Sequence, residues 1–221
     1  MRILLASMTI APDVVAKLKA AAPGHVVVAD DEAAVAREAP AADAFVCSDV
    51  VYSANIATAL KTATKLKWLQ LCTVGFDNAV RHGFPAGATL TNVGDAYSVS
   101  VALHALALML ALQRAIPQMV ANQPAGKWQR DLTDKLIVPD GQTLVMVGFG
   151  GIGREVARLV RALGMKVISV SRSGRPDAAA DEVYPASRLA EVLPRADVVV
   201  LALPLEADTK HMINARALAL M

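Results

Sequence analysis

The chain has 221 residues, of which 55% are hydrophobic, 19% charged and 4% aromatic, and its formal net charge is +2. This length accommodates one large domain or two modest ones, and the composition excludes a mainly disordered chain. Because the net charge is small and the basic residues are scattered, we expect neither a nucleic-acid partner nor a membrane-surface patch.

The cysteines and the apolar segments predict a cytoplasmic protein. Cys47 and Cys72 lie far apart, with no histidine or cysteine at ligand spacing, so we expect two buried thiols and no metal site, with a disulfide or a zinc site as the alternatives. The N-terminal segment reaches Pro12 too early for a secretory signal. The longest apolar run, 101–112, is too short to span a bilayer. A soluble protein in a reducing compartment is therefore expected.

Strands and helices alternate through residues 1–97, which we take as one domain. The alternation predicts a parallel sheet with helices on both faces, an α/β domain of the flavodoxin-like type. The expected strands cover 2–7, 25–30, 44–48, 67–73 and 88–93, and the expected helices cover 12–24, 31–38 and 53–66.

A long helix is predicted from Ser98 to Gln118. It is apolar over most of its surface, so we expect it to be deeply buried, between domains or against the second subunit of a homodimer. His104, on this helix, is expected to be a packed structural residue rather than a catalyst. The polar segment 122–142, interrupted by proline and glycine, predicts a linker into a second unit.

From Thr143 onward the alternation begins again. It predicts a Rossmann-type, doubly wound nucleotide-binding domain, which together with the long helix occupies residues 98–221. In order, the pattern predicts a strand, a glycine-rich turn, a helix at 154–163, strands at 166–171 and 182–184, a helix at 187–196 and a strand at 197–205.

The glycine-rich turn matches the dinucleotide-binding pattern G-x-G-x-x-G at Gly148, Gly150 and Gly153. In this pattern the first glycine permits a tight turn, the second lets a pyrophosphate approach the backbone, and the third lets the helix pack close to the strand. Unpaired N–H groups at the helix N-terminus meet the phosphates, so Gly151 and Ile152 join the expected site. A glycine-rich turn without a ligand is the alternative, but the complete strand–turn–helix–strand unit favours dinucleotide binding.

The end of the following strand predicts which dinucleotide is bound. An NAD site usually has an Asp or Glu here, about 20 residues beyond the glycines, to accept from the ribose 2′-OH. This chain has Ser171, Arg172 and Ser173 instead, with Arg175 close behind and no carboxylate to repel a 2′-phosphate. We therefore predict NADP(H) in preference to NAD(H). The alternative is that Arg172 is a solvated loop residue.

Four segments, in this order, carry a resemblance to a known family. The chain resembles the D-isomer-specific 2-hydroxyacid dehydrogenases, and SRS in this framework is similar to the NADPH-using glyoxylate and hydroxypyruvate reductases. The resemblance implies hydride transfer between NAD(P)H and a small 2-oxo or 2-hydroxy acid. The segments are LKWLQLCTVGFDNAV, TNVGDAYSVSVALHALALMLALQR, VGFGGIGREVARLVRALGMKVISVSRS and LPRADVVVLALPLEADTKHMINARALALM.

The resemblance also implies further site residues. Val74 and Gly75 match the segment whose backbone N–H groups hold the substrate carboxylate. A glycine-containing turn after a buried strand can offer such donors, although an ordinary strand-to-helix turn is the alternative. The resemblance further implies a wall beside the cofactor and a hydroxyl near its nicotinamide half, at Ala202, Leu203, Pro204 and Thr209.

No catalytic residue is assigned within the chain. The family's substrate-binding Arg and its Glu–His pair are expected beyond Met221, and the four histidines of this chain lie in none of those positions. We therefore expect a fragment of a longer enzyme or an incomplete gene product, with the strand at 197–205 exposed as an apolar edge. The alternative function is a non-catalytic NAD(P)-binding module, similar to the redox-sensing co-repressors related to this family.

Overall fold

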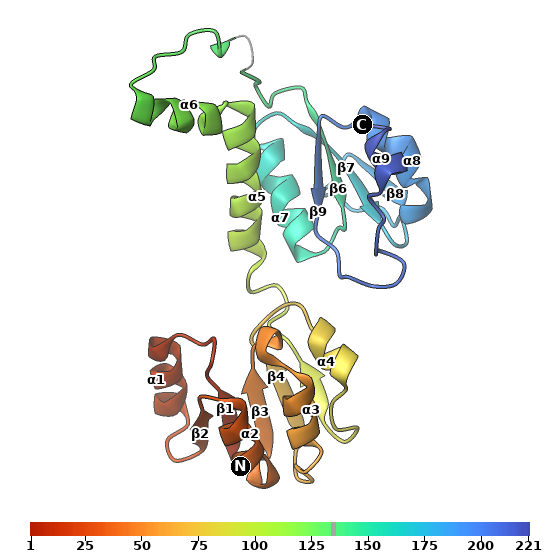
Figure 1. Cartoon of the computed structure of the whole chain (residues 1–221). Coiled ribbons are helices and arrows are strands. Elements are labelled where there is room, and N and C mark those ends of the chain that lie inside the picture. Colours follow the sequence, from red (N-terminus) through yellow and green to blue (C-terminus); the bar gives the residue numbers. More distant parts are fainter. Residues whose placement is uncertain (134–135) are drawn as a thin grey trace. The chain divides into compact units, whose positions relative to one another are not determined.

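The computed structural model describes residues 1–133 and 136–221, so part of the expected linker, residues 134–135, lies outside the described residues. The chain divides into two compact units, Met1–Gly94 and Asp95–Met221, so the boundary lies three residues before the one predicted after residue 97. Each unit has its own parallel sheet (Figure 1). The expected α/β class, with a parallel sheet in each half, is confirmed.

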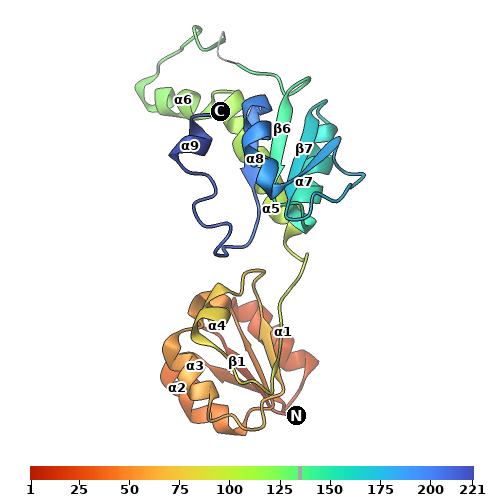
Figure 2. The same ribbon diagram turned by 90° about the vertical axis from the view of Figure 1, so that its right-hand side faces the viewer.

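The unit Met1–Gly94 is a five-stranded parallel sheet in the order β2-β1-β3-β4-β5, the flavodoxin-like order. Helices α2, α3 and α4 cover one face and pack with the strands around the apolar core, while α1 lies on the other face (Figure 2). The strands are β1 (Ile3–Ala6), β2 (Val26–Ala29), β3 (Ala44–Cys47), β4 (Trp68–Leu71) and β5 (Thr89–Thr91), and the helices are α1 (Pro12–Ala21), α2 (Glu32–Glu38), α3 (Ala54–Leu60) and α4 (Asp77–His82).

The unit Asp95–Met221 is a four-stranded parallel sheet in the order β8-β7-β6-β9. Its strands alternate their side chains between two apolar layers, one under α5 and α7 and the other under α8 and α9 (Figure 1). The strands are β6 (Thr143–Val147), β7 (Lys166–Ser171), β8 (Glu182–Pro185) and β9 (Val198–Leu201), and the helices are α5 (Ser98–Gln113), α6 (Ile116–Asn122), α7 (Gly151–Arg161), α8 (Leu189–Val192) and α9 (Ala215–Leu218). Among the described residues β9 is an edge strand, and its Leu201 is 51% exposed.

The single helix expected at 98–118 is two helices. α5 ends at Gln113, Ala115 adopts a left-handed conformation with φ of 51°, and α6 begins at Ile116. Pro117 lies in the first turn of α6, where it lacks the N–H needed to continue α5 and its ring would clash with the carbonyl of Gln113. Proline therefore divides an otherwise continuous apolar pattern.

Within the single chain this helix is buried on one face only, so its expected burial between domains or against a second subunit stays a prediction. One face of α5 packs against α7 through Ala102 and Met109, but the opposite face is exposed, with Leu108 54% and Leu112 72% exposed. His104 is also exposed rather than packed. Within the described part of the chain, no single helix is long and apolar enough to cross a membrane; α5 and residues 116–125 reach that length only as a pair bent by 65°.

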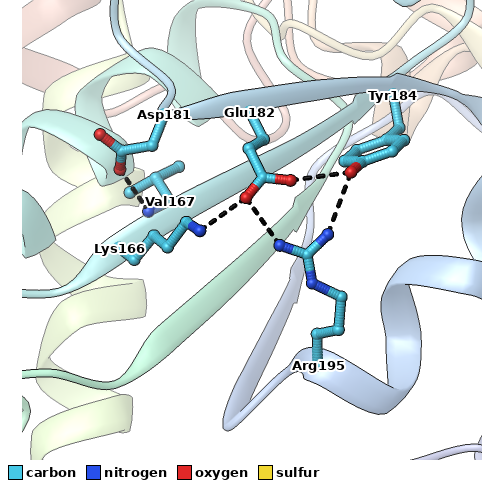
Figure 3. Close-up of polar contacts among 6 residues, drawn as sticks. All are labelled: Lys166, Val167, Asp181, Glu182, Tyr184 and Arg195. Atoms are coloured by element: carbon cyan, nitrogen blue, oxygen red, sulfur yellow. Dashed lines mark hydrogen bonds and ion pairs between the residues drawn. The ribbon is translucent and has the colours of Figure 1, made fainter.

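An ion-pair cluster at the start of β8 fixes this edge of the sheet. Glu182 accepts hydrogen bonds from Arg195 (2.7 Å), Lys166 (2.6 Å) and the hydroxyl of Tyr184 (2.7 Å) (Figure 3). These donors, Arg195 first, hold the pKa of Glu182 far below its usual range, so the carboxylate stays charged. Because Lys166 begins β7, the cluster holds β8 on the strand that ends at Ser171.

Candidate functional site

The turn between β6 and α7 leaves a row of backbone donors free. Gly150 precedes the helix in an extended conformation, and Arg154 is the first residue whose N–H bonds back, to the carbonyl of Gly150 at 3.0 Å. The N–H groups of residues 149–153 donate to no acceptor among the described residues. They lie at the N-terminus of an eleven-residue helix, where the partial positive charge favours an anion.

Two of the three motif glycines leave no room for a side chain, whereas the third faces open space. Gly148 has φ of +94°, and a Cβ there would overlap the carbonyl oxygen of Ala202 at the end of β9. A Cβ on Gly153 would lie 2.5 Å from the carbonyl oxygen of Gly148. At Gly150 no atom lies within 4 Å of an added Cβ. The motif thus brings strand, turn and helix together and leaves room beside the free donors.

The other two residues expected in this turn serve packing. A Cβ on Gly151 would overlap the carboxylate of Asp95 and lie 2.6 Å from Oγ of Ser98, so this glycine lets α7 approach the start of α5. The side chain of Ile152 packs against the apolar layer under α5 and α7. Their contribution to an anion site is confined to their N–H groups.

A cavity of about 420 Å³ opens beside the glycine turn. The carboxyl ends of β6, β7 and β9 form it, together with the loop after β9, and open parallel sheets bind ligands at this edge. Gly151, Ile152, Gly153 and Ser173 are not among the lining residues. The expected residues that do line it are Gly148, Gly150, Ser171, Arg172, Ala202, Leu203, Pro204 and Thr209.

The expectation that no carboxylate lies at the end of β7 is wrong. Glu206, from the loop after β9, lines the cavity and pairs with Arg172 at 2.5 Å. The two residues are 34 positions apart in the chain, so the segment SRS alone could not reveal this contact. Some of the other lining residues lie at or beside strand ends, which was a usable signal in the sequence. The further lining residues that the sequence did not reveal are Val147, Phe149, Val170, Ala186, Asp208 and Met212.

Two expected hydroxyls shape the loops that surround the cavity. Oγ of Ser171 accepts from the N–H of Gly174 at 3.1 Å, which closes the tight turn after β7. Oγ1 of Thr209 donates to the carbonyl of Pro204 and accepts from the N–H of Glu206, both at 2.7 Å. Thr209 therefore folds the loop that presents Glu206, while Ser171 keeps its own O–H proton available to a ligand.

The residues expected to hold the substrate carboxylate belong to the unit Met1–Gly94. Val74 and Gly75 are exposed, and within the described ranges their N–H groups donate to no protein acceptor. Their carbonyls are fixed, since Asn92 donates to the carbonyl of Val74 at 2.8 Å and Thr73 donates to that of Gly75 at 2.9 Å. This arrangement leaves a pair of anchored backbone donors at the end of β4.

Asp49 supports this loop and was missed by the sequence analysis. Its buried carboxylate accepts from the N–H of Asn78 at 3.0 Å and from that of Ala79 at 2.9 Å, in the first turn of α4. The side chain of Asn78 in turn donates to the carbonyl of Asp49 at 3.0 Å. An Asp after a buried strand is a common helix cap, but its partner helix lies 29 residues away.

The histidines provide no acid/base pair in the part of the chain that the structure describes. None forms an ion pair with a carboxylate there, and His25 instead meets the carbonyl of Met1 at 2.7 Å. The candidate site lies at the β6–α7 turn and the cavity beside it, where the free N–H groups can bind an anion.

Known proteins are similar to this chain in sequence and in fold. Residues 106–221 match the family described as "D-isomer specific 2-hydroxyacid dehydrogenase, NAD binding domain". Hydroxypyruvate reductase from Thermotoga maritima is 34% identical over 176 residues, which are 78% of this chain and 56% of that protein. Glyoxylate reductase from Thermococcus gammatolerans is 33% identical over 166 residues, 72% of this chain and 50% of that protein.

The structural similarity extends over nearly the whole chain. A crystal structure of a D-isomer specific 2-hydroxyacid dehydrogenase family protein from Aeromonas salmonicida matches with a TM-score of 0.82 and 29% sequence identity, covering 96% of this chain and 67% of that one. The chain spans about half the length of the glyoxylate reductases that it matches. Because the family match covers more than half of its residues and includes the glycine turn, the chain belongs to the D-isomer-specific 2-hydroxyacid dehydrogenases.

Proposed function

We propose that the whole protein is an NADP(H)-dependent reductase of a small 2-oxo acid. The observation that carries this proposal is the row of free N–H groups at residues 149–153 beside a cavity that also contains Arg172. The glyoxylate and hydroxypyruvate reductases among its relatives support the substrate class. The activity is proposed for the whole protein because this chain spans only about half of those relatives.

The residues present fit a dinucleotide. The N–H groups of residues 149–153 would hold its diphosphate. Ser171 and Arg172, which line the cavity, and the adjacent Ser173 would hold the 2′-phosphate that distinguishes NADP(H) from NAD(H). Apolar side chains such as Val147 and Leu203 line the rest of the cavity. When bound, the reduced cofactor supplies the hydride, and the protein supplies binding, orientation and charge.

The proposed substrate-binding site is the loop after β4. The anchored N–H groups of Val74 and Gly75 would bind the carboxylate of the 2-oxo acid, because adjacent backbone donors form an anion-binding concavity. Asp49 would act as a positioning residue by fixing α4 directly after this loop.

The proposal predicts a cofactor preference in the whole protein. With glyoxylate or hydroxypyruvate as substrate, kcat/KM should be at least about tenfold higher with NADPH than with NADH, because charge-assisted hydrogen bonds to the 2′-phosphate contribute roughly 1.5–3 kcal/mol. Absorbance at the reduced nicotinamide band measures both rates. Equal rates, or faster turnover with NADH, would contradict the NADP(H) preference. Cofactor binding without turnover of any 2-oxo acid would favour the alternative, a non-catalytic NAD(P)-binding module.

We also propose that a homodimer covers the exposed face of α5. Leu108 and Leu112 lie on that face and present large apolar side chains to solvent in the single chain. Sedimentation velocity at micromolar concentration should give twice the monomer mass, and Leu112→Glu should shift the protein toward monomer because it puts a charge in an apolar interface. A wild-type protein that sediments as a monomer would contradict this proposal.

A further inference from the structure

An ion pair connects two loops at the edge of the cofactor cavity. Arg172 follows β7 directly, Glu206 lies in the loop after β9, and Nη2 of the arginine is 2.5 Å from Oε2 of the glutamate. In the sheet, β7 and β9 flank β6 on either side. The pair therefore joins the loops on both sides of the glycine turn, and both of its side chains line the cavity.

The loop after β9 holds the backbone of Glu206 in a defined position. The N–H of Glu206 donates to Oγ1 of Thr209 at 2.7 Å, and its carbonyl accepts from the N–H groups of Thr209 at 3.1 Å and Lys210 at 2.9 Å. Because this turn fixes the backbone of Glu206, it keeps the carboxylate of that residue beside the cavity. The turn 171–174 fixes the position of Arg172 in the same way.

Glu206, the partner of Arg172, carries an anionic group that resembles the 2′-phosphate in its hydrogen bonding. A carboxylate and a phosphate monoester both accept paired hydrogen bonds from a guanidinium, so only one of them can take the same N–H groups. This inference rests on the function proposed above, in which Arg172 binds the 2′-phosphate. In that case the carboxylate of Glu206 and the 2′-phosphate compete for Arg172. We propose that Glu206 is a specificity-determining residue: its carboxylate occupies Arg172 in place of the 2′-phosphate and thereby lowers the selectivity for NADP(H) over NAD(H).

The exposure of the pair sets the size of this effect. The side chain of Arg172 is 81% exposed and that of Glu206 is 44% exposed, so water screens their attraction and the pair exchanges readily. A dianionic phosphate can therefore displace the carboxylate, but it then lies near an unpaired negative charge. The unphosphorylated cofactor does not need to break the pair, so Glu206 affects the two cofactors differently.

Two adenine nucleotides that differ only in the 2′-phosphate test this proposal on the full chain. Calorimetric titration with adenosine 2′,5′-bisphosphate and with adenosine 5′-monophosphate should show tighter binding of the bisphosphate by the wild type. Glu206→Gln should tighten bisphosphate binding about fivefold, because an exposed pair contributes up to about 1 kcal/mol, and should leave the monophosphate within about twofold. Bisphosphate affinity equal to that of the wild type would overturn the proposal.

Asp208 offers a matched control. It lines the same cavity in the same loop, and it makes no ion pair within the described residues. Asp208→Asn removes a negative charge from the same cavity without freeing Arg172, so it should tighten bisphosphate binding less than Glu206→Gln does. An equal effect of Glu206→Gln and Asp208→Asn on bisphosphate binding would overturn direct competition for Arg172. In an Arg172→Ala background, Glu206→Gln should have no further effect.

The outcomes also separate this inference from the function on which it rests. A wild type that prefers the bisphosphate but is unaffected by Glu206→Gln overturns the role of Glu206 and leaves the NADP(H) site standing. If neither the wild type nor Glu206→Gln prefers the bisphosphate, the proposed NADP(H) site fails, and the role of Glu206 fails with it.

Discussion

Replacing Gly148 with alanine is expected to weaken NADP⁺ binding more than tenfold and to lower the free energy of unfolding by about 3 kcal/mol. An alanine at φ of +94° is strained, and its Cβ would overlap the carbonyl oxygen of Ala202. Relief requires the turn or β9 to move, although the N–H of Ala202 bonds to the carbonyl of Val147 at 2.9 Å. That movement would misalign the free donors of residues 149–153. Denaturant unfolding and a cofactor titration measure the two effects.

Gly141→Ala is the matched control for this substitution. Gly141 also has a positive φ, +78°, but no atom lies within 4 Å of an added Cβ. Gly141→Ala should therefore lower the free energy of unfolding only by the cost of a left-handed alanine, about 1 kcal/mol, and leave the cofactor affinity unchanged. If Gly148→Ala matched Gly141→Ala in both stability and affinity, the close approach of the glycine turn to β9 would have no energetic consequence.

Asp49→Ala is expected to lower the free energy of unfolding by about 2–3 kcal/mol and to raise KM for the 2-oxo acid in the whole protein. The substitution leaves the N–H groups of Asn78 and Ala79 without their buried acceptor. The first turn of α4 then loosens, and with it the loop that carries Val74 and Gly75. The affinity for NADP⁺ should stay at the wild-type value, because every residue lining the cofactor cavity belongs to the other unit.

A second helix cap in the same unit distinguishes loss of stability from loss of positioning. Ser53 caps α3 by accepting from the N–H of Ile56 at 3.2 Å. Ser53→Ala should therefore lower the free energy of unfolding by about 1 kcal/mol without changing KM for the 2-oxo acid. A normal KM in Asp49→Ala, measured where the variant is folded, would show that Asp49 has no positioning role.

The sequence by itself determined the features that depend on neighbouring residues. Alternating apolar runs and helical periodicity predicted the strands of both sheets, and the spacing of Gly148, Gly150 and Gly153 predicted the turn that binds a dinucleotide. The order of motifs along the chain was sufficient to identify the family. These signals are local because hydrogen bonding within a turn, a helix or a strand depends on residues a few positions apart.

The tertiary structure decided the contacts between distant segments. Only the packed sheet brings Glu206 to Arg172, 34 positions away, and so places a carboxylate where the local sequence offered none. Likewise Asp49 reaches Asn78 only because β3 and β4 are neighbours in the sheet. Which side chains meet at the carboxyl edge of a parallel sheet depends on strand order and on the paths of the connecting loops. Those paths are fixed by burial of the whole apolar core, which no short segment encodes.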